Sequence, residues 1–134
     1  MTIQLGTTLR NNMIGQYETT VGAGPKLQLF SGAQPANCAA ADSGTKLAEI
    51  TLPADWMTAP SNGGITLNGT WSGAGLVAGT AAHYRLKDSA GTTCHEQGSV
   101  TLTAGGGDLT LDNTNIAVSQ AFNVTSWNRT QGGA

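Results

Sequence analysis

Charge is scarce in this sequence. Of 134 residues, 10% are charged, with 6 Lys and Arg against 8 Asp and Glu and a formal net charge of -2. A soluble domain usually has about 25% charged residues. So few basic side chains cannot neutralise many phosphates, which argues against nucleic-acid binding through a basic surface. Low net charge combined with 39% hydrophobic residues also argues against intrinsic disorder.

Long apolar runs are missing as well. No stretch of about 18 apolar residues occurs, and residues 1–6 lack the basic stretch and apolar segment of a signal peptide. We therefore expect neither a membrane-spanning helix nor export by a standard signal.

Cysteine is limited to Cys38 and Cys94, which form no metal or redox motif such as C-x-x-C. In the absence of an export signal, the cytosolic redox potential favours two reduced thiols. The alternative is a Cys38–Cys94 disulfide, which would close a long loop and stabilise the fold by about 2–4 kcal/mol.

Clusters of catalytic or metal-binding side chains are not evident. His83 and His95 are predicted on one face of a hairpin together with Arg85, opposite the core. Because no third ligand is predicted, a polar stripe facing solvent or another subunit explains them better than a metal site.

The acidic and glycine-rich turns give no binding motif. Residues 105–107 are glycines that precede a predicted strand rather than a helix, so they do not form a phosphate loop. The neighbouring Asx residues lack the spacing of an EF-hand loop and are explained as turn formers: Asp108, Asp112, Asn113 and Asn115. With no catalytic-triad motif and no plausible pair of carboxylates for glycan cleavage, we expect no enzyme, no cofactor and no metal.

Glycine, by contrast, is abundant, with 19 residues that fall mostly between short segments of alternating polarity. This pattern predicts an all-β chain, a single-domain jelly-roll-like β-sandwich of about eight antiparallel strands with one short N-terminal helix. The clearest strand segments are residues 26–30, 46–52, 64–72, 81–87, 99–103, 108–112 and 117–127.

Helical spacing of apolar residues occurs only near the N-terminus and predicts a helix over residues 8–18. The residues that define it are Leu9, Met13, Ile14 and Tyr17, with Thr7 and Thr8 as possible N-caps and Gly22 and Gly24 beyond its end. The single domain would consist of an N-terminal arm and helix (1–24), the sandwich (25–128) and a flexible tail (129–134), mobile unless a partner holds it.

The sequence Ser89-Ala90-Gly91 fits a three-residue hairpin loop with Gly91 in the left-handed conformation. The resulting register places Leu86 opposite Cys94 and Arg85 opposite His95. Cys94 would then be a small core residue on the Tyr84 face. Glu96 would lie on that face too, either protonated, paired, or at a bulge or strand end.

Three tryptophans are the side chains most suited to binding a partner. Trp71 shares a face with Ile65 and Leu67, which predicts a core position. Trp56 lies in a long connection, and Trp127 has the opposite parity from Phe122 and Val124, so both fit either an interface or local packing. With the apolar residues of the N-terminal arm, the candidate interface residues are Leu5, Leu9, Met13, Trp56, Met57 and Trp127.

Three segments resemble small structural proteins of tailed bacteriophages, among them capsid cement, or decoration, proteins with a jelly-roll fold. These segments are residues 26–36 (KLQLFSGAQPA), 82–93 (AHYRLKDSAGTT) and 109–127. The resemblance covers residues 10 to 128, and its motifs are structural, so it transfers no catalytic residue.

The resemblance implies a virion protein, made in the cytoplasm of a bacterial host, that binds the outer capsid surface and bridges major capsid protein subunits. It also implies a homodimer or homotrimer, without nucleic-acid or membrane partners. We expect residues 1–14 and the loops 31–45 and 53–64 to make the contacts. The alternative is a tail- or fibre-associated virion module that binds host surface glycan through Trp56 or Trp127.

Overall fold

The computed structural model of the protein describes residues 3–134. Within this range the chain forms one α-helix and ten short strands, so the prediction of an all-β chain with one N-terminal helix is confirmed. The elements are α1 (Thr7–Val21), β1 (Lys26–Phe30), β2 (Lys46–Thr51), β3 (Gly64–Thr66), β4 (Ser72–Ala74), β5 (Gly79–Thr80), β6 (His83–Lys87), β7 (Cys94–Leu102), β8 (Leu109–Leu111), β9 (Asn115–Ile116) and β10 (Ala121–Thr130).

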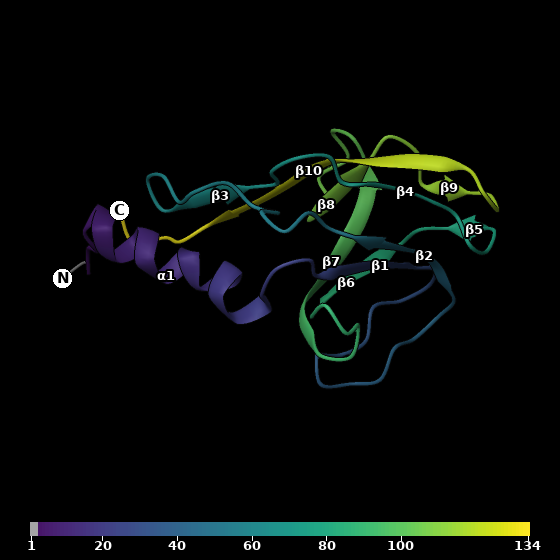
Figure 1. Ribbon diagram of the computed structural model, residues 1–134, viewed down its shortest axis with the longest axis horizontal. Helices are drawn as coiled ribbons and strands as arrows, with labels where there is room; N and C mark the ends of the chain where they lie inside the picture. Colours follow the sequence, from purple (N-terminus) through teal and green to yellow (C-terminus); the bar gives the residue numbers. More distant parts are fainter. Residues whose placement is uncertain (1–2) are drawn as a thin grey trace.

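Most strands belong to one curled sheet with the order β2-β1-β6-β7-β8-β10-β3, and β4 also pairs with β10 (Figure 1). Beyond β4, the backbone N–H groups of Leu76 and Val77 donate to the carbonyl of Leu47 in β2, at 2.8 and 3.3 Å. These bonds bring the two sides of the sheet together, which gives a half-barrel. A jelly-roll arrangement is not confirmed.

One strand pair departs from the expected antiparallel arrangement, because β7 and β8 are parallel. The chain returns beside β7 through a glycine-rich connection that packs against Thr101. A Cβ atom at Gly105 or Gly107 would lie 2.7 or 2.8 Å from the Thr101 hydroxyl, so only glycine permits this tight return. The predicted strand 64–72 is also interrupted, at Gly69 with φ 74°, and forms β3 and β4 instead.

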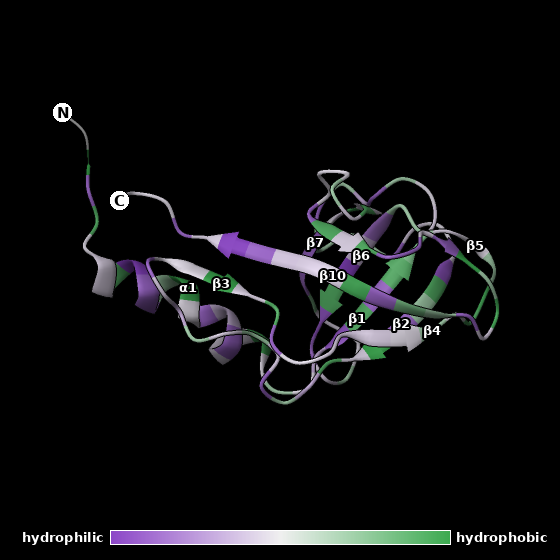
Figure 2. Cartoon of the chain, turned by 90° about the horizontal axis from the view of Figure 1, so that it is seen from above, coloured by the Kyte–Doolittle hydropathy of each residue, from purple (hydrophilic) through white to green (hydrophobic). Residues whose placement is uncertain are grey.

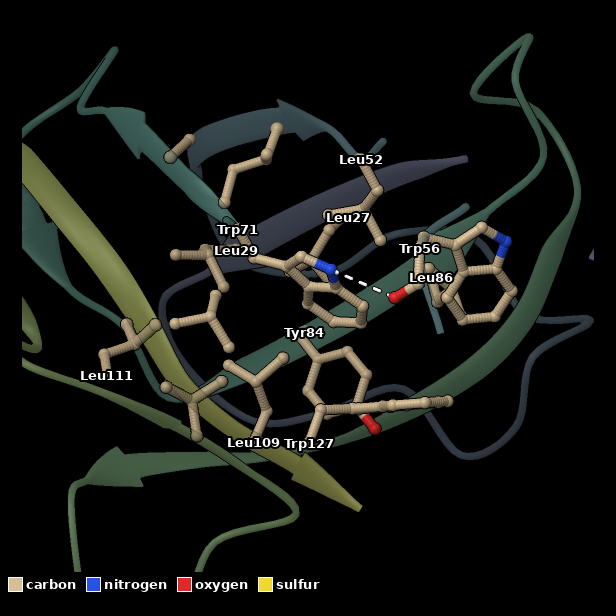
Figure 3. Close-up of a cluster of buried hydrophobic side chains, with 14 of the residues drawn as sticks. Leu27, Leu29, Leu52, Trp56, Trp71, Tyr84, Leu86, Leu109, Leu111 and Trp127 are labelled. Carbon is tan, nitrogen blue, oxygen red and sulfur yellow. Dashed lines mark hydrogen bonds between the residues drawn. The ribbon is translucent and has the colours of Figure 1, made fainter. Parts of the chain in front are cut away.

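The core contains all three tryptophans, whose ring centroids lie 5.5 to 6.2 Å apart (Figure 3). The prediction for Trp71 is confirmed. The predictions that Trp56, Met57 and Trp127 face a partner are wrong, since all three are at most 1% exposed. A β-bulge between Val124 and Ser126 shifts the parity of β10 and turns Trp127 inward.

The connection 53–64 lies over the end of the sheet instead of projecting from it. The indole nitrogen of Trp56 donates to the carbonyl of Gly22, at 2.9 Å, and Met57 forms a bridge with Leu67. This connection closes the core beside the end of α1.

Helix α1 is longer than predicted, and only part of its predicted apolar stripe packs against the core. Gly6 is its N-cap and no side chain caps it, so the expected roles of Thr7 and Thr8 are wrong, whereas Gly22 ends the helix as expected. Its buried residues are Arg10, Ile14 and Val21. In the described part of the chain, no helix has the length and apolar character needed to span a membrane.

The C-terminal segment is held along its length. Strand β10 runs to Thr130, past the predicted boundary at 128, and ends beside α1 (Figure 2). Gln131 N–H then donates to the Gly63 carbonyl at 2.7 Å, and Leu5 N–H donates to the Gly133 carbonyl at 2.6 Å. The tail therefore pairs with the turn after residue 62 and with the N-terminal arm, without another chain.

The β6–β7 hairpin has the predicted left-handed Gly91, with φ 73°, but a different register. A bulge between Leu86 and Lys87 pairs Lys87 with Cys94 and Leu86 with Glu96. Glu96 therefore lies on the core face, as predicted. Cys94 does not, because the bulge turns it toward the loop 31–45, where it lines a pocket with Asp42 and Arg85.

Candidate interaction surfaces

The outer face of α1 is an exposed, uncharged apolar surface. Leu9 and Met13, one helical turn apart, are 50% and 42% exposed. Met13 also lines a hollow of about 260 Å³ between the helix and β7, whose other lining residues are Gln16, Tyr17, Thr20, Val21 and His95. Leu5, half-buried against the C-terminal segment, lies just before the helix. Three of the six predicted interface residues therefore belong to this arm, and we call Leu9, Met13 and this hollow the arm surface.

A second apolar surface, which was not predicted from the sequence, lies at the other end of the molecule. Leu76, Val77 and Val118 are 57%, 42% and 63% exposed. A bridge between Gly75 and Val118 joins the β4–β5 connection to the β9–β10 connection, at the end opposite α1 (Figure 1). We call these three residues the distal surface.

Val118 lies within the predicted strand 117–127, at the same parity as Phe122. The strand begins only at Ala121, and Ser119 has a left-handed φ of 64°, so the alternation does not extend back to Val118. The signal available in the sequence was the Leu76-Val77 pair in a glycine-bounded connection, outside any alternating strand.

Glu96 is the centre of a buried polar cluster that fixes α1 to the sheet. Its carboxylate accepts five hydrogen bonds, from the hydroxyls of Tyr17 and Tyr84, the indole nitrogen of Trp127, and two guanidinium nitrogens of Arg129. The Tyr17 bond is 2.7 Å long and the bond from Arg129 Nε is 2.8 Å. Of the three possibilities left open by the sequence, Glu96 is paired.

The cluster favours an ionised carboxylate. Burial by itself would raise the pKa of Glu96, but the hydrogen bonds and charge of Arg129 and the hydrogen bonds of Tyr84 and Trp127 outweigh it, so the pKa is lowered. Burial and the hydrogen bond to Glu96 raise the pKa of Tyr17 to about 12. Tyr17 therefore stays a neutral donor and holds the helix beside β7.

The loop 31–45 covers the outer face of β6. Asp42 accepts from Arg85 Nη1 at 2.6 Å and from Lys87 Nζ at 2.8 Å. His83 is stacked on Phe30 beneath the start of the loop, with its Nδ1 3.0 Å from the Gly32 carbonyl. The predicted polar stripe of His83 and Arg85 is therefore buried.

The two histidines are not brought together. His83 lies under the loop, whereas His95 lines the hollow beside α1, because the strand bulges between Cys94 and Glu96. Within residues 3–134, no three side chains among His, Cys, Asp and Glu are placed to hold a metal ion.

A polar hollow of about 330 Å³ contains two carboxylates. It is lined by Tyr84, Glu96, Gln97, Asp108, Asn128, Arg129 and Thr130. Glu96 is engaged as described, and Asp108 accepts from the backbone N–H and hydroxyl of Ser99, at 3.0 and 3.1 Å. Both carboxylates are thus already hydrogen-bonded, Glu96 to side chains of α1, β6 and β10 and Asp108 to Ser99 of β7.

Comparison of the chain with models of protein families, with curated proteins and with solved structures finds no match.

Proposed function

We propose that the protein is a capsid cement, or decoration, protein of a tailed bacteriophage, which binds the outer surface of the head and bridges major capsid protein subunits. The observation that supports this most is the presence of two exposed apolar surfaces at opposite ends of the molecule. A bridging protein needs two separate contacts. Many copies that each make modest contacts gain affinity from simultaneous engagement.

The chemistry of the arm surface fits contact with another protein. In α1 the charged residues are Arg10, which is buried, and Glu18, so Leu9 and Met13 are covered without removing a charge from water. We infer that copies associate as homodimers or homotrimers around the symmetry axes of the head, because most oligomers of one chain have closed symmetry. In a dimer, the two-fold contact would use the same patch on both copies. This proposal involves no nucleic acid, membrane or catalytic step.

The alternative, a tail- or fibre-associated module that binds host glycan, depended on Trp56 and Trp127 as aromatic platforms. Both rings are buried, so no observation favours this alternative over the cement function. The two differ in where the protein lies on the virion.

Imaging of purified virions tests the location. We expect density for this chain distributed over the outer surface of the head. Density confined to the tail, or no density on the particle, contradicts the proposal.

Substitutions then test the two surfaces. Leu9→Asp on the arm surface and Val118→Asp on the distal surface should each lower the affinity for heads that lack the protein by at least about tenfold, because a buried Leu or Val side chain contributes about 1.5–3 kcal/mol. Leu102→Asp is the matched control, since the exposure of Leu102, 52%, lies between that of Leu9 and that of Val118, and Leu102 belongs to neither surface. If both surface variants bind as the control does, these surfaces do not bridge the head.

Point variants are needed because deletion of residues 1–14 would damage the fold. Arg10 donates to the Asn62 carbonyl at 2.9 Å, Asn11 accepts from Gly63 N–H at 2.7 Å, and Ile14 is in the core. Leu9 has no such role.

A further inference from the structure

Cys38 and Cys94 come from distant parts of the sequence but line one pocket. The pocket, about 290 Å³ in volume, lies between the loop 31–45 and the β6–β7 hairpin. Both cysteines are free thiols and both are partly exposed, so a small reagent in solution can reach them.

The contact between the loop 31–45 and the β6–β7 hairpin does not depend on the cysteine side chains. Arg85 Nη2 donates to the Cys38 carbonyl at 2.8 Å, and Arg85 Nη1 donates to the Ala40 carbonyl at 3.0 Å. Asp42 adds ion pairs to Arg85 and Lys87. Strand β6, which carries Arg85, pairs with the strand that begins at Cys94, so the loop holds Cys38 above that strand in the reduced protein.

The two thiols lie close enough in this pocket for Cys38 to affect the pKa of Cys94. Burial, followed by a hydrogen bond with the Cys38 thiol, raises the pKa of Cys94 to about 11, although the charge of Arg85 acts in the opposite direction. Cys94 is therefore protonated at neutral pH, unlike the low-pKa cysteines of redox catalysts. Any disulfide formation would be a slow, single event rather than rapid turnover.

We propose that Cys38 and Cys94 form a latent redox clamp, reduced at synthesis and converted to an intramolecular disulfide by small-molecule disulfides such as glutathione disulfide. One cysteine thiolate attacks the small disulfide and releases one thiol. The second thiolate then attacks the mixed disulfide, forms the Cys38–Cys94 bond and releases the second thiol. The protein loses two electrons and two protons, and the small disulfide is reduced to two thiols.

The bond would fasten the loop 31–45 to β7 when the protein leaves a reducing cytoplasm. A disulfide between residues far apart in sequence restricts the unfolded chain strongly. In an oxidising medium the protein with this disulfide would therefore be more stable against unfolding than the reduced protein.

The test uses the purified, reduced full-length chain, freed of reductant and incubated with glutathione disulfide at about pH 8.5, where ordinary thiols are half ionised. Denaturation with N-ethylmaleimide, mass spectrometry and non-reducing peptide mapping then identify the state of each cysteine. We expect a monomer that has lost two hydrogen atoms, takes up no maleimide and yields a Cys38–Cys94 cross-linked peptide. Its unfolding equilibrium constant should be at least about tenfold smaller than that of the reduced protein.

Cys38→Ser and Cys94→Ser serve as mass controls and should stop at the mixed disulfide with one glutathione. The proposal is overturned if the folded parent protein retains two free thiols, takes up two glutathiones, or cross-links only between chains. These outcomes concern the chain alone, so they are independent of whether it binds a capsid.

Discussion

Replacing Glu96 by Gln tests whether the buried cluster holds the helix to the sheet. The substitution keeps the size of the side chain but removes the charge that Arg129 faces. It also replaces one acceptor oxygen by an NH2 group, which cannot accept: at Oε2 the bond from Tyr17 is lost, and at Oε1 the bonds from Tyr84 and Trp127. The side chains of Glu96 and Arg129 are only 12% and 18% exposed, so water replaces little of what is lost.

The expected loss follows from this burial. Removing one partner of a buried ion pair destabilises a protein by about 3–5 kcal/mol. Because both side chains retain slight exposure, we expect the lower end, about 3 kcal/mol. That is a large share of the roughly 5–15 kcal/mol by which a domain is stable, and it corresponds to a fall in Tm of about 10 °C.

Urea unfolding followed by tryptophan fluorescence measures the effect, with Trp127 as a reporter because its indole donates directly to Glu96. Glu49→Gln is the matched control. Glu49 accepts from Gln28 at 2.7 Å and pairs with Lys46 at 3.5 Å, but its side chain is 31% exposed, so its loss should be under about 1 kcal/mol. Equal effects of the two substitutions would refute the reasoning.

The pH dependence gives a second readout of the same variant. Since the pKa of Glu96 is lower in the folded protein, its contribution to stability is present above the unfolded pKa and is lost as the pH falls through the folded pKa. Glu96→Gln should therefore lose less stability on acidification than the parent protein does. An equal loss of unfolding free energy on acidification in the two proteins would contradict this.

Two further predictions concern the contacts of the helix and the loop. The pKa of Tyr17 is raised from 10.0 to about 12, so its contribution to stability is complete below pH 10 and is lost as the pH rises toward 12. The Tm of Tyr17→Phe should therefore fall less than that of the parent protein between pH 10 and pH 12. An equal fall of Tm in the two proteins contradicts this. Asp42→Asn should loosen the loop 31–45, because Arg85 and Lys87 lose their shared counter-ion; hydrogen exchange of Ala40 N–H should accelerate several-fold while strand amides keep their protection, and uniform exchange rates would contradict it.

The sequence predicted the strand content better than the arrangement of the strands. Alternation located β1, β2 and β6 closely, because polar and apolar side chains alternate along these regular strands, even though both faces of β1 and β6 are buried. It failed where a single residue is inserted, as in β10, where the bulge before Ser126 reverses the facing of Trp127. Local polarity carries no signal for such an insertion, since the partner strand decides where it occurs.

The candidate surface was predictable in part. Leu9, Met13, Ile14 and Tyr17 all followed from helical spacing, but the spacing alone did not show that Ile14 and Tyr17 pack against the core while Leu9 and Met13 stay exposed, nor that Arg10 is buried. Arg10 is buried because it meets a carbonyl in the turn at residue 62, far along the chain. The role of Glu96 depended likewise on Arg129, a partner that residue patterns in one strand cannot indicate.

Strand β10 follows every other strand of the sheet in the sequence, yet three of them pair with it. Strands β3 and β4 take their backbone partner from residues 121–130, β8 takes one of its two partners there, and Glu96 depends on Arg129 for its counter-ion. On the ribosome the sheet therefore cannot close before residues 121–130 have emerged, and such long-range pairing folds slowly. During that interval unpaired strand edges are open to other chains. The yield of folded protein in a cell thus depends on the competition between closure of the sheet around β10 and association through those edges.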